Sequence, residues 1–424
     1  MHFSNAGGES VRHGVRQITR RASLRSYFAS LARAAAAVVM LLPLLAAPLS
    51  GAVSAQTATP QNGDFVSKAK NAYLMDADSG AVLYQLNGEE AVPPASMSKL
   101  MTLAVLFKTL KAGNLRLTDE FVVSEGAWRR GGAPSGTSAM MVPVNTRVKL
   151  EELLLGIIIQ SGNDACIAVA EGLAGTEEAF AKMMNEEAAR LGLKKSTFRN
   201  STGLYHPEHL MSVRDLSVLA RHIIRNFPEY HAIFAQREFS YRKHRFINRN
   251  PLLFLNIGAD GMKTGFIKES GYSMVATARQ GERKLIAVIT GMQSANDRRD
   301  EAKRMLEWGF RAFTEVKLFD AGEKVADARV WGGDRFYIPV VGNGDVIIVL
   351  PKFPANQKLK ADIVYNYPLK PPIRKGDPVA KLRVTSSSNA VNEIQLFAGE
   401  DVEPSSLMRR GLDTLAHQAL RFIP

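Results

Sequence analysis

The sequence predicts an α+β protein in which helices cover one antiparallel sheet and a small all-β domain follows. Three observations support this prediction. A strand, turn and strand pattern begins near residue 72, and a second one begins near residue 271. The long stretch between them has apolar residues at helical spacing. Beyond residue 316 the chain changes to short apolar runs separated by Gly and Pro.

The first 55 residues have the pattern of an export signal. Several arginines precede an uncharged apolar run over Ala34–Leu49, which Pro43 and Pro48 interrupt. These prolines favour a cleaved signal peptide over 1–55 rather than a permanent membrane span, followed by a linker over 56–65. The protein is therefore expected to be exported, by a route that the sequence leaves open.

A first domain is expected over 66–315. Its expected elements are a hairpin at 72–75 and 81–84, helices at 96–111, 149–159, 164–173, 176–191 and 213–226, strands at 271–278 and 284–290, and a helix at 302–313. A small all-β domain is expected over 316–403, with strands at 336–340, 346–350, 359–367 and 380–384.

The last segment, 404–424, is expected to form an amphipathic helix. Its apolar residues at helical spacing are Met408, Leu412, Leu415, Ala419 and Phe422, and arginines occupy the other faces. Such a helix is typical of a segment that lies in a membrane interface. Packing of the same helix on the β domain is the alternative.

Composition and charge narrow the class of protein. With 46% hydrophobic and 22% charged residues, the 424-residue chain is typical of a globular protein. The net charge is +13 over the whole chain, and the part of it that lies beyond residue 55 is spread out and suits work beside anionic envelope polymers or lipid headgroups. No basic stripe with interleaved aromatic residues indicates nucleic-acid binding. The single cysteine, Cys166, excludes internal disulfides, and its apolar neighbours favour a packing role.

The first motif with chemical potential is Ser96-Met97-Ser98-Lys99, which follows Pro93-Pro94 and opens an apolar helical run. Residues three apart on a helix share a face, so the amine of Lys99 can reach the hydroxyl of Ser96. A serine hydroxyl needs a base to become a nucleophile, and a buried lysine can act as that base. Taken alone, the pattern is more often a capping serine beside a solvated lysine.

Two further motifs change that assessment. Ser161-Gly162-Asn163 lies between two apolar helical stretches, and Lys263-Thr264-Gly265 is expected where the second strand hairpin starts. Each alone reads as a plain turn. Together, in the order S-x-x-K, S-G-N and K-T-G, they match the signature of penicillin-binding proteins and class A β-lactamases.

On these motifs the chain resembles the low-molecular-mass penicillin-binding proteins, specifically the serine D-Ala-D-Ala carboxypeptidases. The resemblance covers the chain from residue 66 onward. It extends through Pro94-Ala95-Ser96, Ser161-Gly162-Asn163-Asp164-Ala165, Ser201-Thr202-Gly203-Leu204, Ser212-Val213-Arg214-Asp215-Leu216, Asp260-Gly261-Met262-Lys263-Thr264-Gly265-Phe266 and Trp308-Gly309-Phe310.

The resemblance implies a role for each site residue and requires no cofactor. Ser96 is the expected nucleophile, Lys99 the general base and Ser161 the proton relay. The expected substrate-binding residues are Asn163, Lys263, Thr264, Gly265 and Arg298, and the expected oxyanion donors are the backbone N–H groups of Ser96 and Phe266. Phe266 departs from the family members that carry histidine after K-T-G. Arg299, the neighbour of Arg298, is the alternative for that position.

The implied activity is removal of the terminal D-alanine from peptidoglycan pentapeptide stems, with β-lactam antibiotics trapped at the acyl-enzyme stage. The implied location is the periplasmic face of the bacterial inner membrane. The alternatives are a D,D-endopeptidase, a weak β-lactamase and a non-catalytic envelope-binding protein. A class A β-lactamase needs a deacylating glutamate, and the corresponding stretch Leu191–Leu204 has no acidic residue.

A metal site at His206-Pro207-Glu208-His209 is disfavoured, because no further His or carboxylate cluster in the sequence completes a three-ligand set.

Overall fold

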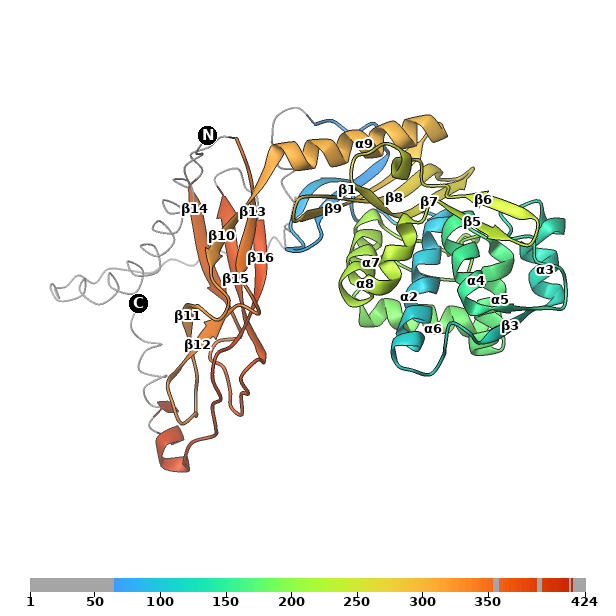
Figure 1. The fold of residues 1–424 in the computed structure, drawn as a ribbon. Helices are drawn as coiled ribbons and strands as arrows, with labels where there is room; N and C mark the ends of the chain where they lie inside the picture. Colours follow the sequence, from blue (N-terminus) through green and yellow to red (C-terminus); the bar gives the residue numbers. More distant parts are fainter. Residues whose placement is uncertain (1–64, 354–357, 387–390, 412, 415–424) are drawn as a thin grey trace, which may run out of the picture. The chain divides into compact units, whose positions relative to one another are not determined.

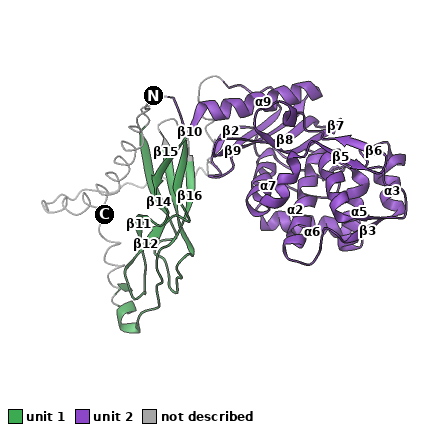
Figure 2. Ribbon diagram, viewed as in Figure 1, with its two compact units in different colours: residues 1–61, 315–350, 354–424 green, residues 62–314, 351–353 purple. Residues whose placement is uncertain are grey.

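The computed structural model describes residues 65–353, 358–386, 391–411 and 413–414. The expected signal peptide and nearly all of the linker therefore lie outside the described residues. The chain divides into two compact units (Figure 2): the larger comprises Asn62–Thr314 with Pro351–Phe353, and most of the rest belongs to the smaller. Each unit is described by itself.

A five-stranded antiparallel sheet is the frame of the larger unit. Its order is β2-β1-β9-β8-β7, so strands from both ends of the unit meet in one sheet. The bounds are β1 (Asn71–Asp76), β2 (Val82–Leu86), β7 (Ala259–Ile267), β8 (Gly271–Gln280) and β9 (Arg283–Met292). Ala72 of β1 pairs with Ile289 of β9, which confirms the expected assembly from distant segments.

Helices cover this sheet (Figure 1), with α9 along one face and the cluster containing α2 and α7 on the other. The helical segments are η1 (Ala95–Ser98), α2 (Lys99–Lys111), α3 (Glu125–Gly131), η2 (Ala133–Ser135), α4 (Leu150–Leu155), η3 (Gly156–Gln160), α5 (Asn163–Ala174), α6 (Glu177–Arg190), α7 (Val213–Asn226), α8 (Pro228–His231), η4 (Ala232–Ala235), η5 (Pro251–Phe254) and α9 (Ala295–Ala312). Two short hairpins complete the unit: β3 (Glu120–Val123) with β4 (Thr146–Lys149), and β5 (Glu238–Tyr241) with β6 (His244–Ile247).

The central helix α2 is buried on every side over its first nine residues, Lys99–Phe107. A helix that is apolar all round belongs in a protein interior, and α2 is the middle of the main core cluster. The one charged side chain in this buried stretch is Lys99, which is fully buried. The fold therefore holds an amine inside its core at the helix start.

Helix α9 begins earlier than the sequence predicted. The apolar spacing indicated a helix over 302–313, but α9 starts at Ala295, and Phe313 already belongs to strand β10. The first two turns are mostly polar and exposed, so they lack the apolar periodicity on which the prediction depended. Ser294 caps the helix by accepting a 3.0 Å hydrogen bond from the Asp297 N–H.

The smaller unit is all-β, as predicted. Its elements are β10 (Phe313–Phe319), β11 (Lys324–Arg329), β12 (Tyr337–Val341), β13 (Val346–Pro351), β14 (Leu359–Val364), β15 (Pro378–Ser386) and β16 (Val391–Ala398). Strands β11-β12-β16-β15-β14 form one sheet, and β10 pairs with β13. Alternate residues along its strands point into the core, as Leu382 and Val384 of β15 do.

The start of the C-terminal segment lies on the smaller unit. Residues 407–411 and 413–414 are helical, and Pro404 bridges to Gly333. The buried carboxylate of Asp413 pairs with Arg329 and accepts a 2.8 Å hydrogen bond from the Gly332 N–H. Most of the apolar stripe predicted for this tail lies outside the described residues. Within the described part of the chain, no helix is long and apolar enough to cross a membrane.

The cap of α9 gives a stability prediction. Ser294→Ala should lower the free energy of unfolding of the larger unit by about 1 kcal/mol, because the Asp297 N–H loses its acceptor. Ser294→Thr keeps the hydroxyl and should cost less. Urea unfolding followed by the fluorescence of Trp308, which lies on α9, measures both. Equal losses in the two variants would contradict the capping role.

Candidate active site

Ser96 lies in the short 3-10 turn η1 that leads into α2. The turn is unusual because the residue before the serine, Ala95, has a φ of +50°. A left-handed conformation costs a non-glycine residue roughly 1–2 kcal/mol, so the surroundings must hold it. Ser96 itself is half-buried, at the opening of the buried helix.

Lys99 brings the first two motifs together. Its Nζ donates to Ser96 Oγ at 3.1 Å and to Asn163 Oδ1 at 2.7 Å. A third bond runs to the backbone carbonyl of Thr202 at 2.5 Å. The amine thus contacts the hydroxyl that the sequence analysis paired with it, together with two neutral acceptors.

These two acceptors direct the lone pair of a neutral lysine. A neutral amine has two N–H bonds and one lone pair, and a carbonyl oxygen can only accept. Asn163 presents its oxygen because its Nδ2 donates to Thr137 Oγ1 at 2.9 Å. With both N–H bonds taken by Asn163 and Thr202, the lone pair of Lys99 faces the hydroxyl of Ser96. This is the arrangement that a general base needs.

Burial makes the neutral form accessible. The pKa of Lys99 is lowered to about 8, chiefly by burial and in smaller part by the positive charge of Arg249. Acidic groups near Lys99 act in the opposite direction. The groups that interact with it electrostatically are Asp164, Cys166, Glu177, His209, Arg249 and Lys263.

The second motif sits in a tight turn between η3 and α5. Ser161 has a φ of +65°, and its buried Oγ has no hydrogen-bond partner among the described residues. Next to it, a Cβ on Gly162 would come within 2.9 Å of Asp164 Oδ1. The Asp164 carboxylate accepts from the N–H groups of Met140 and Val142, which ties a neighbouring loop to the turn.

The third motif lies inside edge strand β7 rather than at the start of the hairpin, because β7 begins four residues earlier, at Ala259. Lys263 is buried, and its Nζ donates to the Thr264 carbonyl at 3.2 Å. Burial and then the charge of Lys99 lower its pKa well below the usual value. A Cβ on Gly265 would lie 3.2 Å from the Cβ of Ala95, so the glycine lets β7 pack tightly against η1, the turn that carries Ser96.

Phe266, Tyr272 and Arg298 form a stack beyond this strand. The ring of Phe266 is 53% exposed, and its centroid lies 4.3 Å from that of Tyr272. The guanidinium of Arg298 lies 5.7 Å from the centroid of the Tyr272 ring. Arg299 instead pairs with Asp300. Arg298 is therefore the arginine of this pair that is linked to the strand carrying K-T-G.

The described part of the site is rich in unpaired positive charge. Lys99, Lys263 and Arg298 are buried, and Arg249 is exposed beside them and donates to Ser138 Oγ at 2.6 Å. Among the described residues, none of the four pairs with a carboxylate. Each lowers the pKa of a neighbour, so they share one electrostatic environment. Such a site attracts an anionic group.

Several site features were missed from the sequence. The Thr202 carbonyl acts through the backbone, so its side chain gives no signal. Tyr272 reads as an ordinary strand residue, and Arg249 precedes the short helix η5 with no motif around it.

Cys166 and His209 are buried near the site but belong to none of its three motifs. Burial raises the pKa of the Cys166 thiol to about 12, which keeps it protonated. His209 is buried, and its Nε2 forms a 3.0 Å hydrogen bond with Ser98 Oγ. In the described ranges, no group of three His, Cys, Asp or Glu side chains could hold a metal ion.

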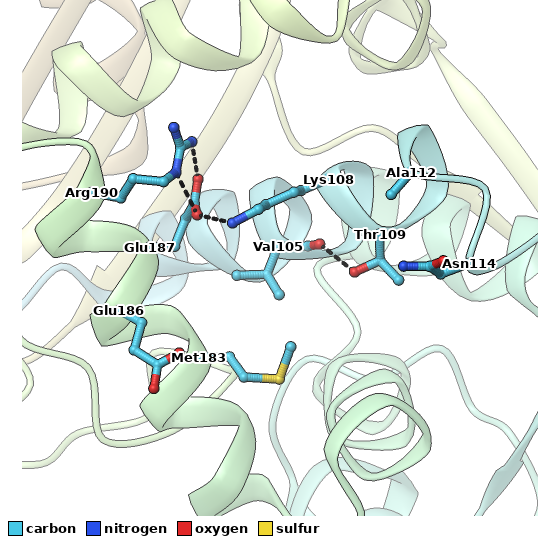
Figure 3. A pocket seen from close by; sticks show the side chains of 9 residues that line it. All are labelled: Val105, Lys108, Thr109, Ala112, Asn114, Met183, Glu186, Glu187 and Arg190. Carbon is cyan, nitrogen blue, oxygen red and sulfur yellow. Dashed lines mark hydrogen bonds and ion pairs between the residues drawn. The ribbon is translucent and has the colours of Figure 1, made fainter.

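A separate hollow of about 340 Å³ lies between α2 and α6 (Figure 3). Val105 and Met183 line it, and Lys108 and Arg190 both point at Glu187 there. Its charged groups thus neutralise one another, and no residue of the three motifs lines it.

Comparison with known proteins agrees with this geometry. A family model described as D-alanyl-D-alanine carboxypeptidase matches residues 55–294, and one described as penicillin-binding protein 5, C-terminal domain, matches 313–404. D-alanyl-D-alanine carboxypeptidase DacC of Escherichia coli is 36% identical over 343 residues, 80% of this chain and 86% of the relative. DacA of Haemophilus influenzae is 33% identical over 349 residues, 82% of this chain and 88% of the relative.

Among solved structures, penicillin-binding protein 5 from Haemophilus influenzae superposes with a TM-score of 0.71 at 33% identity, covering 80% of this chain and 99% of that one. Fold and site together define a serine hydrolase of the penicillin-binding class. The chain belongs to the D-alanyl-D-alanine carboxypeptidase family.

The pKa of Lys99 gives a testable pH dependence. Acylation by a penicillin should rise about tenfold per pH unit and level off above about pH 8, since only the neutral amine accepts a proton. Lys99→Arg keeps the charge but cannot deprotonate, so it should lose at least about 100-fold, as Lys99→Ala does. Labelling rates with a fluorescent penicillin from about pH 6 to 9 check this. Near-normal labelling of Lys99→Arg would show that lysine serves only as a charge.

Proposed function

We propose that this protein removes the terminal D-alanine from peptidoglycan pentapeptide stems through an acyl-enzyme on Ser96. The observation that carries the proposal is the position of the Lys99 amine, within hydrogen-bond distance of Ser96 Oγ, Asn163 Oδ1 and the Thr202 carbonyl. In the neutral amine, the two N–H bonds can go to the two carbonyl oxygens, which leaves the lone pair for Ser96. The enzyme needs no cofactor for this chemistry, because the proton acceptor, nucleophile and charged groups are all side chains.

In the first half-reaction, Lys99 takes the proton of Ser96 Oγ as the oxygen attacks the carbonyl carbon of the penultimate D-alanine. The backbone N–H groups of Ser96 and Phe266 stabilise the oxyanion. The C–N bond then breaks, and the leaving amine of the terminal D-alanine receives the proton through Ser161. The unpartnered, buried hydroxyl of Ser161 supports this relay role.

In the second half-reaction, water attacks the ester, and its proton returns through the same base. The carboxylic acid of the shortened stem leaves, and Ser96 regains its hydrogen. A β-lactam acylates Ser96 in the same way, but its opened ring stays attached and the ester persists.

The substrate is held by its backbone and its carboxylate. Strand β7 is the last in its sheet, so its free edge can pair with an extended peptide. Lys263, Thr264 and Arg298 bind the terminal carboxylate, and Asn163 orients the peptide. The cations without carboxylate partners support this role.

The alternatives receive less support. A β-lactamase needs a free deacylating carboxylate. Glu177 interacts with Lys99, but its oxygens are bonded to Ser201 and Arg130. The complete set of Ser96, Lys99, Ser161 and Lys263 argues against a non-catalytic envelope-binding protein. A D,D-endopeptidase would use the same site on cross-linked peptides.

The proposed organisation is a signal peptide over 1–55, a linker over 56–65, a catalytic domain over 66–315, an all-β domain over 316–403 and a membrane-associated helix over 404–424. The mature enzyme would then work at the periplasmic face of the inner membrane. Exposed Leu407 and Met408 beside Arg409 support contact with an anionic lipid surface.

The nucleophile is tested by Ser96→Ala, which should abolish both covalent penicillin labelling and D-alanine release, because the other hydroxyl of the motif, on Ser98, is buried and bonded to His209. Ser98→Ala, in the same turn, is the matched control and should still be labelled. Wild-type labelling of Ser96→Ala, measured by gel fluorescence, would overturn the mechanism.

The tail is tested by a deletion that respects the packing on the β domain. Because Asp413 and Pro404 contact that domain, only 415–424 should be removed. The truncated enzyme should bind anionic vesicles more weakly, since it keeps Leu407 and Met408 but loses the apolar side chains of 415–424, whose burial contributes a few kcal/mol at roughly 25 cal/mol per Å². Its peptide turnover should be unchanged. Undiminished vesicle binding in a flotation assay would show that residues other than 415–424 make the membrane contact.

A further inference from the structure

The loop between α6 and α7 contacts η1, the turn that carries Ser96, and the start of α2. The Thr202 carbonyl takes the 2.5 Å hydrogen bond from Lys99 Nζ. One residue further on, Gly203 has a φ of +78°, and a Cβ there would lie 1.9 Å from the carbonyl oxygen of Ala95. This stretch therefore contacts both the base and the residue before the nucleophile through its backbone.

Glu177 and Thr102 hold Ser201 of this loop from outside it, and Asn200 bridges the residues that follow. Asn200 Oδ1 accepts from the Thr202 N–H at 3.1 Å, the Thr202 hydroxyl at 3.0 Å and the Gly203 N–H at 2.8 Å. Its Nδ2 donates to the Leu204 carbonyl at 2.9 Å. All four hydrogen bonds stay within the loop, so Asn200 sets the course of the backbone that presents the Thr202 carbonyl.

We propose that Asn200 is a positioning residue for Lys99, acting through the Thr202 carbonyl to direct the lone pair of the base at Ser96. The inference rests on the proposed function, because it requires Lys99 to act as the base. It gives a role to the Ser201-Thr202-Gly203-Leu204 segment, which supplies no side chain to the proposed reaction.

The physical argument concerns the second acceptor of the amine. If the Thr202 carbonyl turns away, one N–H of neutral Lys99 is free to turn toward Ser96 Oγ in place of the lone pair. The loss also removes a hydrogen bond that stabilises the protonated form, which moves the pKa of Lys99 further down. Asn200 variants should therefore lower the limiting rate and the midpoint of the pH profile together.

The groups that act on Lys99 by charge come from several elements: Asp164 and Cys166 from α5, Glu177 from α6, Arg249 from the segment before η5, Lys263 from β7 and His209 from the same loop. Asn200 is uncharged, so its substitution by alanine changes none of these charges. Burial lowers the pKa of His209 to about 4, outside the range of the experiment.

The test compares Asn200→Ala with Asn185→Ala in the full chain. Asn185 of α6 is a matched control, because its amide makes three hydrogen bonds, two to the backbone of Phe198 in the same loop and one to the Ala181 carbonyl of α6. It makes none to Thr202 or Gly203. The measurement is the rate constant for acylation by a fluorescent penicillin from about pH 6 to 9, with thermal melting of each variant.

Asn200→Ala should lose on the order of 10- to 100-fold in the limiting rate at high pH, with a midpoint below that of the wild type. Asn185→Ala should melt at a lower temperature but keep the wild-type midpoint and limiting rate. Should Asn200→Ala fail to fold, Asn200→Ser carries the same test, because its side chain is too short to bridge Thr202 and Leu204.

A folded Asn200 variant with the wild-type midpoint and limiting rate would overturn the inference alone. A wild-type profile without a midpoint near pH 8, or normal labelling of Lys99→Arg, would instead overturn the base role of Lys99, and the inference with it.

Discussion

The site depends on one buried amine that has neutral partners. Most buried charges in proteins are paired, because an unpaired ion in a low-dielectric interior is costly. Lys99 contacts a hydroxyl, an amide oxygen and a backbone carbonyl instead. A carboxylate at the same distance would stabilise the ammonium form and raise its pKa. The choice of neutral acceptors therefore keeps a proton-accepting lysine within reach of neutral pH.

Carboxylates do lie in the surroundings of Lys99, and the structure engages them elsewhere. Asp164 bonds the N–H groups of Met140 and Val142, and Glu177 bonds Ser201 and Arg130. Their charges still act on Lys99 from a distance, but neither is hydrogen-bonded to the amine. These acids hold loops in place around Lys99 without forming a hydrogen bond to its amine.

The nucleophile turn is held between two glycines from distant parts of the chain. Gly203 lies against the carbonyl of Ala95, and Gly265 lies against its Cβ. A Cβ on Gly203 would fall 1.9 Å from that carbonyl oxygen and would displace the turn, whereas a Cβ on Gly265 would fall 3.2 Å from the Ala95 Cβ and make a tight contact. This double contact explains how Ala95 keeps its positive φ, and it connects the strand carrying K-T-G to the loop behind the base.

The three motifs and the α+β fold could be predicted because they are carried by side chains and by apolar periodicity. The other features leave no such signal in the sequence. The Thr202 carbonyl is a backbone group, and the polar first turns of α9 lack apolar spacing. Arg249 belongs to no motif and lies near Lys99 only because the chain folds back to it. In the proposed mechanism, the positive charge of the site and the pKa of Lys99 are coupled. Lys263, which we propose binds the carboxylate of the substrate, is coupled electrostatically to Lys99. A carboxylate bound at Lys263 would offset that positive charge and make the Lys99 amine a stronger base when the peptide is in place.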